Sequence, residues 1–127
     1  MGNVSSDPND WTGPAIEACI EVHRHIGPGF PENVYEEAVC IELAERGIPF
    51  ERQAPCAVSY KGHDVGMGKM DIVIARCLVL ELKAAESTGR LHFAQVMSYL
   101  RASGHRLGLL INFNVAMLKN GIRRIIL

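Results

Sequence analysis

The cysteines of this 127-residue chain do not have the spacing of small metal or redox sites. Cys19, Cys40, Cys56 and Cys77 include no Cys-x-x-Cys pair, which argues against a zinc knuckle and against a thioredoxin-like site. No apolar run approaches the roughly 20 residues that cross a bilayer, and no stretch has the pattern of a secretory segment. We therefore expect reduced core thiols in a soluble, cytoplasmic protein that has no membrane partner.

An excess of charge of one sign is also missing. Thirteen Lys and Arg stand against fourteen Asp and Glu, a formal net charge of −1, so binding of a polyanion would require a local basic patch. No Gly-rich loop of the P-loop or Rossmann type occurs, which argues against a nucleotide cofactor. What the chain has is a 48% hydrophobic composition, which together with its length predicts one domain with its own core.

The pattern along the chain predicts a loose polar lead-in over residues 1–11 and a single domain over residues 12–127. The first six residues, beginning Met1-Gly2, also fit the N-myristoylation pattern, and a flexible polar start explains them equally well. The predicted order of two helices, four strands, one helix and two strands indicates an α/β (α+β) fold with a central mixed sheet flanked by helices. The predicted ranges are 12–26, 31–46, 57–60, 64–67, 70–74, 77–83, 91–103, 107–113 and 122–127.

Two charges interrupt the most apolar stretch of the sequence, residues 77–83. Strand alternation places Glu81 and Lys83 on one face, and a turn centred on Arg76 brings Asp71 opposite Glu81, roughly 5 Å away between Cβ atoms. Two carboxylates at this separation invite a divalent cation such as Mg²⁺, and Lys83 could hold a water or offset phosphate charge. An ion pair between Glu81 and Lys83, with Asp71 flanking the hairpin, explains the same residues without a metal.

Several further motifs accompany this charged trio. They are Gly29-Phe30-Pro31-Glu32-Asn33-Val34-Tyr35, Gly47-Ile48-Pro49-Phe50-Glu51, Glu81-Leu82-Lys83-Ala84, Ala94-Gln95 with Tyr99, and Gly108-Leu109-Leu110-Ile111-Asn112-Phe113. On these residues the chain resembles the GxxExxY proteins, which are grouped with the PD-(D/E)xK nuclease-like superfamily. The resemblance implies a restriction-endonuclease-like core in which Asp71 and Glu81 bind Mg²⁺ or Mn²⁺ and Lys83 is the catalytic lysine.

The resemblance also suggests roles for residues on two helices. The superfamily often adds an acidic ligand from the first core helix, which implies Glu32 as a third metal ligand, although a carboxylate at a helix N-terminus also suits the helix dipole. We interpret Glu36, one turn later, as part of a solvated face. Gln95 and Tyr99 share a helix face and resemble the Gln-x-x-x-Tyr helix of RecB-type nucleases, which implies that Gln95 orients the site and Tyr99 contacts substrate. An amide and a phenol at the edge of the core explain this spacing equally well.

The basic residues contain one departure from the family pattern. Members usually carry an arginine shortly before the strand aspartate, whereas this chain has Lys69, which keeps the charge but loses the bidentate fork for phosphate. His92, near a helix start, is assigned a solvated or capping role. A local phosphate-facing patch is predicted around Arg101, and a scattered basic surface is the competing explanation for its last two members. The candidates are Arg101, His105, Arg106, Arg123 and Arg124.

Three functions fit these residues. The first is a Mg²⁺- or Mn²⁺-dependent nuclease that hydrolyses DNA phosphodiester bonds. A homodimer in which each subunit contacts one strand would suit this function. The second is a non-catalytic nucleic-acid-binding or regulatory module that keeps the nuclease-like fold. The third is an enzyme acting on a nonpolymeric phosphate substrate.

Overall fold

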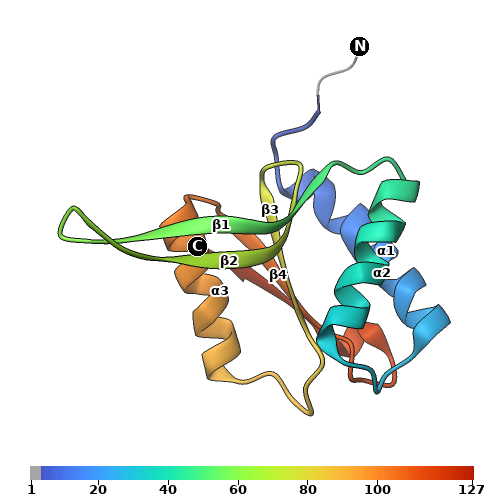
Figure 1. The fold of residues 1–127 in the computed structure, drawn as a ribbon. Helices are drawn as coiled ribbons and strands as arrows, with labels where there is room; N and C mark the ends of the chain where they lie inside the picture. The colour runs from blue at the N-terminus through green and yellow to red at the C-terminus, as the bar shows by residue number, and fades with distance from the viewer. Residues whose placement is uncertain (1–3) are drawn as a thin grey trace.

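The computed structural model describes residues 4–127, so Gly2 of the lipidation pattern lies outside the described residues. Helices pack on both faces of one five-stranded sheet (Figure 1). The elements are α1 (Asn9–Ile26), α2 (Glu32–Glu45), β1 (Phe50–Tyr60), β2 (His63–Ile74), β3 (Leu78–Lys83), α3 (Arg90–Ser103), β4 (Leu107–Asn112), the 3-10 helix η1 (Leu118–Gly121) and β5 (Ile122–Ile126).

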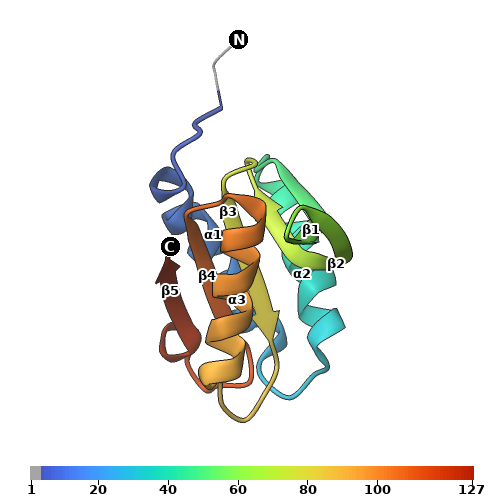
Figure 2. The same ribbon diagram turned by 90° about the vertical axis from the view of Figure 1, so that its left-hand side faces the viewer.

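The sheet is mixed, as predicted. Its strands lie in the order β1-β2-β3-β4-β5; β3 and β4 run parallel, and the other neighbouring strands run antiparallel. Parallel neighbours require a crossover connection, and α3 supplies it by crossing in front of β3 and β4 (Figure 2). The predicted α+β fold, with a central mixed sheet flanked by helices, is therefore confirmed.

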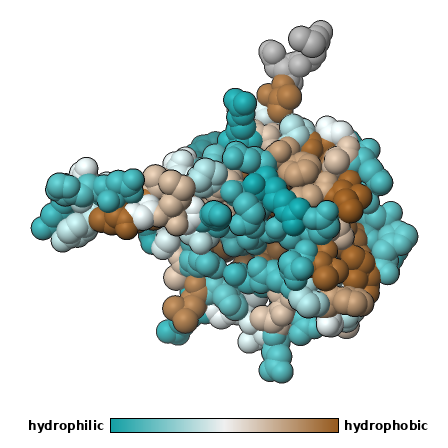
Figure 3. All heavy atoms as spheres, viewed as in Figure 1, coloured by the Kyte–Doolittle hydropathy of each residue, from teal (hydrophilic) through white to brown (hydrophobic). Residues whose placement is uncertain are grey.

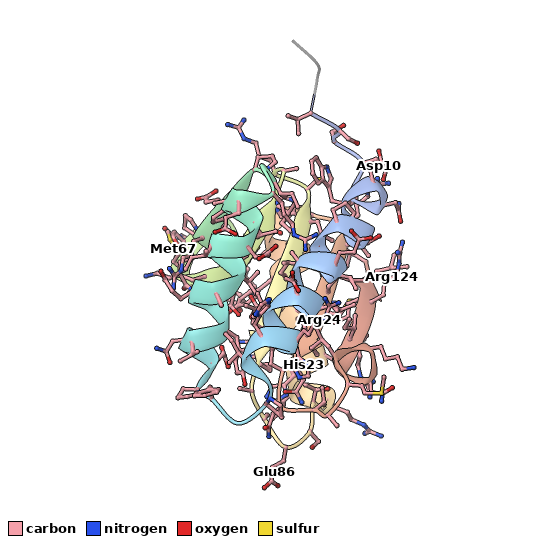
Figure 4. The ribbon with its side chains drawn as sticks, turned by 90° about the vertical axis from the view of Figure 1, so that its right-hand side faces the viewer. Asp10, His23, Arg24, Met67, Glu86 and Arg124 are labelled. Carbon is pink, nitrogen blue, oxygen red and sulfur yellow. The ribbon has the colours of Figure 1, made fainter. Side chains whose placement is uncertain are left out.

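The two faces of the sheet bury different clusters. Leu78, Leu80 and Leu82 of β3 are fully buried in a cluster with residues of α1 and α2, the helices that lie in front of the sheet in Figure 4. Val79 belongs instead to a smaller cluster that includes Leu100 of α3. The predicted alternation of β3 between two faces is thus confirmed.

The cysteines contribute to both faces as small apolar side chains. All four are free and buried. Burial raises the pKa of the Cys19 thiol to about 12, so it remains protonated at neutral pH and is a poor nucleophile. None of the helices in the described part of the chain is long and apolar enough to cross a membrane.

Helix α1 begins earlier than the sequence predicted. It starts at Asn9 rather than near Thr12, so the end of the expected lead-in is helical. The Asp7 carboxylate accepts a hydrogen bond of 3.0 Å from the Asn9 backbone N–H, and Trp11 Nε1 donates to the Ser5 carbonyl at 2.9 Å. These bonds order the segment just before residue 12, where the sequence predicted that the helix begins.

The region between α2 and β3 has one strand fewer than predicted. Segments 64–67 and 70–74 belong to one strand, β2, because its pairing with β1 continues through the two residues between them: Pro55 pairs with Lys69 and Cys56 with Gly68. A Cβ at Gly68 would lie 2.7 Å from Tyr99 Cε1. The glycine therefore marks a close approach to α3 and not the end of a strand.

The long β1–β2 hairpin extends beyond the body of the sheet (Figure 1). Its outer part exposes Val58, Tyr60, Val65 and Met67, and the projecting arm shows hydrophobic side chains among hydrophilic ones (Figure 3). Only the inner half of this hairpin is covered by helices on both faces, and the candidate site lies at that inner half.

Candidate active site

The carboxylates of Asp71 and Glu81 meet where the ladder between β2 and β3 ends. The last paired residues are Ile72 and Leu80, and this register continues to Asp71 opposite Glu81, as the turn centred on Arg76 predicted. Beyond the pair Ile72–Leu80, backbone N–H groups donate to side-chain carboxylates and not to backbone carbonyls of the neighbouring strand. The Asp71 N–H donates to Glu81 Oε1 at 3.0 Å, and the Leu82 N–H donates to Asp71 Oδ2 at 2.9 Å.

These two carboxyl groups share an environment that disfavours their charged forms. Glu81 is 2% exposed; burial raises its pKa to about 8, and the nearby charge of Asp71 and a hydrogen bond between the two carboxyl groups raise it as well. Burial also raises the pKa of Asp71. A buried carboxyl pair of this kind is stabilised by a shared proton or by a cation.

Lys83 faces the same side of β3 as Glu81, one alternation further along. Its positive charge opposes the rise in the pKa of both carboxyl groups. The ion pairs found in residues 4–127 involve other residues, so the simple Glu81–Lys83 ion pair offered as an alternative does not form. The ammonium group therefore lies near the carboxylates without being bound to either one.

A hydrogen-bond network that the sequence did not reveal reaches Asp71 from α2. Gln53 Nε2 donates to Glu36 Oε1 at 2.6 Å and to Asp71 Oδ1 at 3.5 Å, and Arg52 Nε donates to Glu36 Oε2 at 2.8 Å. The Glu36 side chain is only 12% exposed. Its assignment to a solvated face was wrong, because β1 covers it with these two donors.

The backbone at Gln53 explains why this network was missed. Gln53 has a φ of 53°, in the left-handed region that a residue other than glycine rarely adopts. Phe50 packs on the α1–α2 cluster, whereas Ala54, four residues later, lies in the α3 cluster. In regular alternation these two residues would share a face, so the strand changes faces at Gln53, the residue that contacts Asp71.

Glu32 lies at the edge of this region. It is the first residue of α2 and is exposed. Partial burial raises its pKa, Asp71 and Glu36 add to the rise, and Lys83 opposes it, so Glu32 lies within electrostatic range of the site. In residues 4–127 no group of three or more His, Cys, Asp or Glu is arranged to hold a metal ion, so the third-ligand role of Glu32 remains a prediction.

Gln95 and Tyr99 are paired as their spacing predicted. Gln95 Nε2 donates to the Tyr99 hydroxyl at 3.4 Å, and the Tyr99 ring lies against Gly68 of β2. Within the described residues their side chains hydrogen-bond to each other and not to Asp71, Glu81 or Lys83. The pair therefore joins α3 to the inner hairpin, while its orienting and substrate roles remain predictions.

The predicted basic residues are divided between different surfaces. Lys69, a separate substrate-binding candidate, is exposed on β2, and Arg101 of the predicted patch is exposed in the last turn of α3. Arg124 hydrogen-bonds to Asn9 of α1, whereas Arg123 lines a hollow beside α3. A single patch containing both of the last two arginines was wrong, because consecutive strand residues point to opposite faces.

His92 also differs from its expected role. Its Nδ1 atom is buried and has no hydrogen-bond partner in the described residues. His92 lies one helical turn before Val96, which is fully buried against the sheet. The side chain is half-buried, with this nitrogen turned into the protein, so the expected solvated or capping role was wrong.

A family model described as the PD-(D/E)XK nuclease superfamily matches residues 9–125. The chain belongs to this superfamily. The match runs from the start of α1 into β5 and so includes Asp71, Glu81 and Lys83. Comparisons with curated proteins and with solved structures found no significant match.

Members of the PD-(D/E)XK superfamily are typically metal-dependent. The residues present fit a hard divalent cation, because the adjacent carboxyl groups of Asp71 and Glu81 supply oxygen donors. Burial raises the pKa of both groups, so a bound cation would stabilise their charged forms. The carboxylate pair thus supplies oxygen donors of the kind that such an ion binds.

Proposed function

We propose that this protein is a Mg²⁺- or Mn²⁺-dependent nuclease that hydrolyses DNA phosphodiester bonds. The observation that carries the proposal is the Asp71–Glu81 carboxyl pair at the open end of the β2–β3 ladder, in which Glu81 is buried and Asp71 is half-buried. A charged pair at this depth costs several kcal/mol unless a cation compensates it. Membership of the nuclease superfamily supports the same conclusion.

Within the superfamily, we infer that the chain is a GxxExxY protein. Its signature ends at Tyr35, whose hydroxyl donates to the Gly27 carbonyl at 2.6 Å and accepts from the Phe30 N–H at 3.2 Å. The Tyr35 ring stacks on Phe113 with 4.5 Å between centroids. These contacts support a structural role for the signature tyrosine, which fixes the start of α2 and so the position of Glu32.

In the proposed reaction Asp71 and Glu81 hold the metal ion, with Glu32 as an outer acidic group. The bound ion supplies Lewis-acid stabilisation of phosphate charge and activates a water. Lys83 contributes a positive charge beside the reacting phosphate, where a pre-positioned cation stabilises developing negative charge. Gln95 orients the groups at the site.

Substrate contacts come from the surrounding surface in this proposal. Tyr99, Lys69 and Arg101 contact the nucleic acid, although Lys69 lacks the fork with which arginine binds a phosphate. A chain of this size offers little surface for contacts with the bases, so we expect it to recognise the form of the DNA, such as ends or branches, and not its base sequence. A cytoplasmic homodimer with one subunit on each strand remains our expectation.

One observation favours the alternative of a non-catalytic nucleic-acid-binding or regulatory module. In residues 4–127 only a pair of site carboxylates, and no group of three metal-binding side chains, is assembled. A module of this kind would bind nucleic acid with no turnover and retain Asp71 and Glu81 as a regulatory cation site or a relic.

A cleavage assay separates these functions. Labelled single-stranded, duplex and branched DNA, and RNA, are incubated with Mg²⁺, Mn²⁺ or EDTA. We expect metal-dependent cutting of DNA that falls by about 10²-fold or more in Lys83→Ala. Lys119→Ala, which changes an exposed lysine in η1, is the matched control and should cut like the wild type. A folded wild type that binds Mg²⁺ but cuts no substrate would favour the module.

A further inference from the structure

Two arginines converge on a hollow beside the N-terminal end of α3. The hollow has a volume of about 290 Å³ and is lined by Thr88, Gly89, Arg90, Phe93 and Arg123. Arg90 begins α3 and Arg123 lies in β5. Across residues 4–127 the side-chain hydrogen bonds and ion pairs of arginine involve Arg24, Arg46, Arg52 and Arg124 instead. Both guanidinium groups at the hollow are therefore available to a ligand.

The register of the sheet relates this hollow to the carboxylate site. Glu81 of β3 pairs with Leu110 of β4, and Leu110 pairs with Arg123 of β5. Leu110 is buried in the α3 cluster. Residues that pair directly across neighbouring strands point to the same face of the sheet, so Glu81 and Arg123 also lie on the α3 face. Two strand spacings separate them, about 10 Å between Cα atoms.

The chemistry of the hollow suits a phosphodiester. Guanidinium groups bind phosphate oxygens through two parallel hydrogen bonds, and Phe93 adds a 41% exposed aromatic surface. A nucleic-acid strand carries one phosphate for about every 3.4 Å of helix axis. Two sites whose backbones lie about 10 Å apart can therefore be spanned by one strand, with bound phosphates a few nucleotides apart.

We propose that Arg90 and Arg123 form a second phosphate-binding site, which holds a backbone phosphate of the nucleic-acid strand a few nucleotides from the phosphate at Asp71 and Glu81. This site places the strand beside the N-terminal end of α3, because α3 itself covers β4 on this face. The inference rests on the proposed nuclease function for its substrate, and the binding it describes does not require cleavage.

Arg124 offers a matched control. It adjoins Arg123 in β5 but faces the opposite side of the sheet and hydrogen-bonds to Asn9 of α1. If surface charge alone controlled the affinity for nucleic acid, replacing either arginine would weaken binding equally. A built phosphate site depends on Arg123 and not on Arg124.

The test measures binding of labelled 20-nucleotide single-stranded DNA, duplex DNA and RNA by fluorescence anisotropy, with the full chain in EDTA so that nothing is cut. We expect Arg123→Ala and Arg90→Ala each to weaken binding of DNA by about tenfold, and to lower the slope of log affinity against log salt by about 0.7–0.9. Arg123→Lys should recover only part of the affinity, because it restores the charge without the fork. Arg124→Ala should bind like the wild type, and thermal unfolding checks that each variant is folded.

Equal losses in Arg123→Ala and Arg124→Ala, no loss in either, or no binding of any of the three probes by the folded wild type would overturn the inference. Asp71→Asn separates it from the proposed function, because this variant should lose metal-dependent cutting while keeping its affinity in EDTA. If the wild type cuts DNA and Arg123→Ala binds normally, the second site is wrong and the nuclease stands. If Arg123→Ala and Arg90→Ala weaken binding, Arg124→Ala does not, and nothing is cut, the site stands and the nuclease fails.

Discussion

The two faces of β3 differ in what they do for the protein, although one six-residue strand supplies both. Toward α1 and α2 it presents Leu78, Leu80 and Leu82, all fully buried. Toward α3 it presents Val79, then Glu81 and Lys83. The first face gains free energy from burying apolar area, whereas the second holds carboxyl groups in an environment that raises their pKa. Because side chains alternate along β3, the free energy gained by burying the leucines on one face can offset the cost of the charged groups on the other.

The largest effect is expected on the apolar face. Leu80→Ala should lower the free energy of unfolding by about 2–5 kcal/mol, because it leaves a cavity in a fully buried cluster. Urea denaturation measures the change. Ile41→Ala, at a 53% exposed position of α2, is the control and should cost less than about 1 kcal/mol. Equal costs at the two positions would show that the α1–α2 face is not the principal core.

Addition of metal tests the charged face. Mg²⁺ or Mn²⁺ should raise the melting temperature in a dose-dependent way, since an ion bound only by the folded state stabilises it by about 2.7 kcal/mol at 100 times its dissociation constant. Asp71→Ala should abolish this response. The same rise in Asp71→Ala as in the wild type would place the ion elsewhere.

Removing one charge should stabilise the metal-free protein. The pKa of Glu81 is raised from 4.5 to about 8, so the folded state binds this proton more tightly than the unfolded state does. The associated stability is complete below about pH 4.5 and is lost as the pH rises toward 8. Glu81→Gln lacks this titration and can still accept the hydrogen bond from the Asp71 N–H.

We therefore expect Glu81→Gln to be more stable than the wild type at pH 8 in EDTA, by an amount of the order of 2 kcal/mol. The difference should shrink toward pH 5. Urea denaturation of both proteins at several pH values measures it, with Glu45→Gln as a control at an exposed carboxylate. A variant that is less stable at pH 8 would contradict the strained-pair interpretation.

The smallest effect is expected from removing the Tyr35 hydroxyl, which fixes the loop before α2. Tyr35→Phe keeps the ring that stacks on Phe113 and removes the hydroxyl that bonds to Gly27 and Phe30. We expect a loss of about 1–2 kcal/mol in unfolding free energy. Metal-dependent cutting should persist, because the hydroxyl positions a loop and takes no part in the chemistry. An intact fold with abolished cutting would assign Tyr35 a direct role.

Local rules were sufficient to predict the core of the candidate site. A three-residue turn over residues 75–77, centred on Arg76, fixes the register of the strands that flank it, so Asp71 opposite Glu81 could be deduced from arithmetic. The period of two in β3 assigned its leucines and its charges to opposite faces. These inferences succeeded because every relevant contact lies within a few residues of one turn.

Longer-range features could not be predicted from the same rules. The Glu36–Gln53–Asp71 network joins α2, β1 and β2 through a residue with positive φ, and no propensity of glutamine indicates that conformation. The sequence predicted two separate strands on either side of Gly68. The reason for this glycine lies in α3, because the Tyr99 ring fills the space that a side chain at Gly68 would need. In each case the deciding partner is distant in the chain.

The sequence by itself determined the strand register at the turn, the alternation of β3 and the set of charged groups available to a cation. The tertiary structure alone decided which face of the sheet each helix covers, and hence that Arg123 lies on the side of Glu81 while Arg124 contacts α1. The physical reason is that periodicity fixes relative direction within one element, whereas the absolute side depends on how separate elements pack their apolar surfaces together.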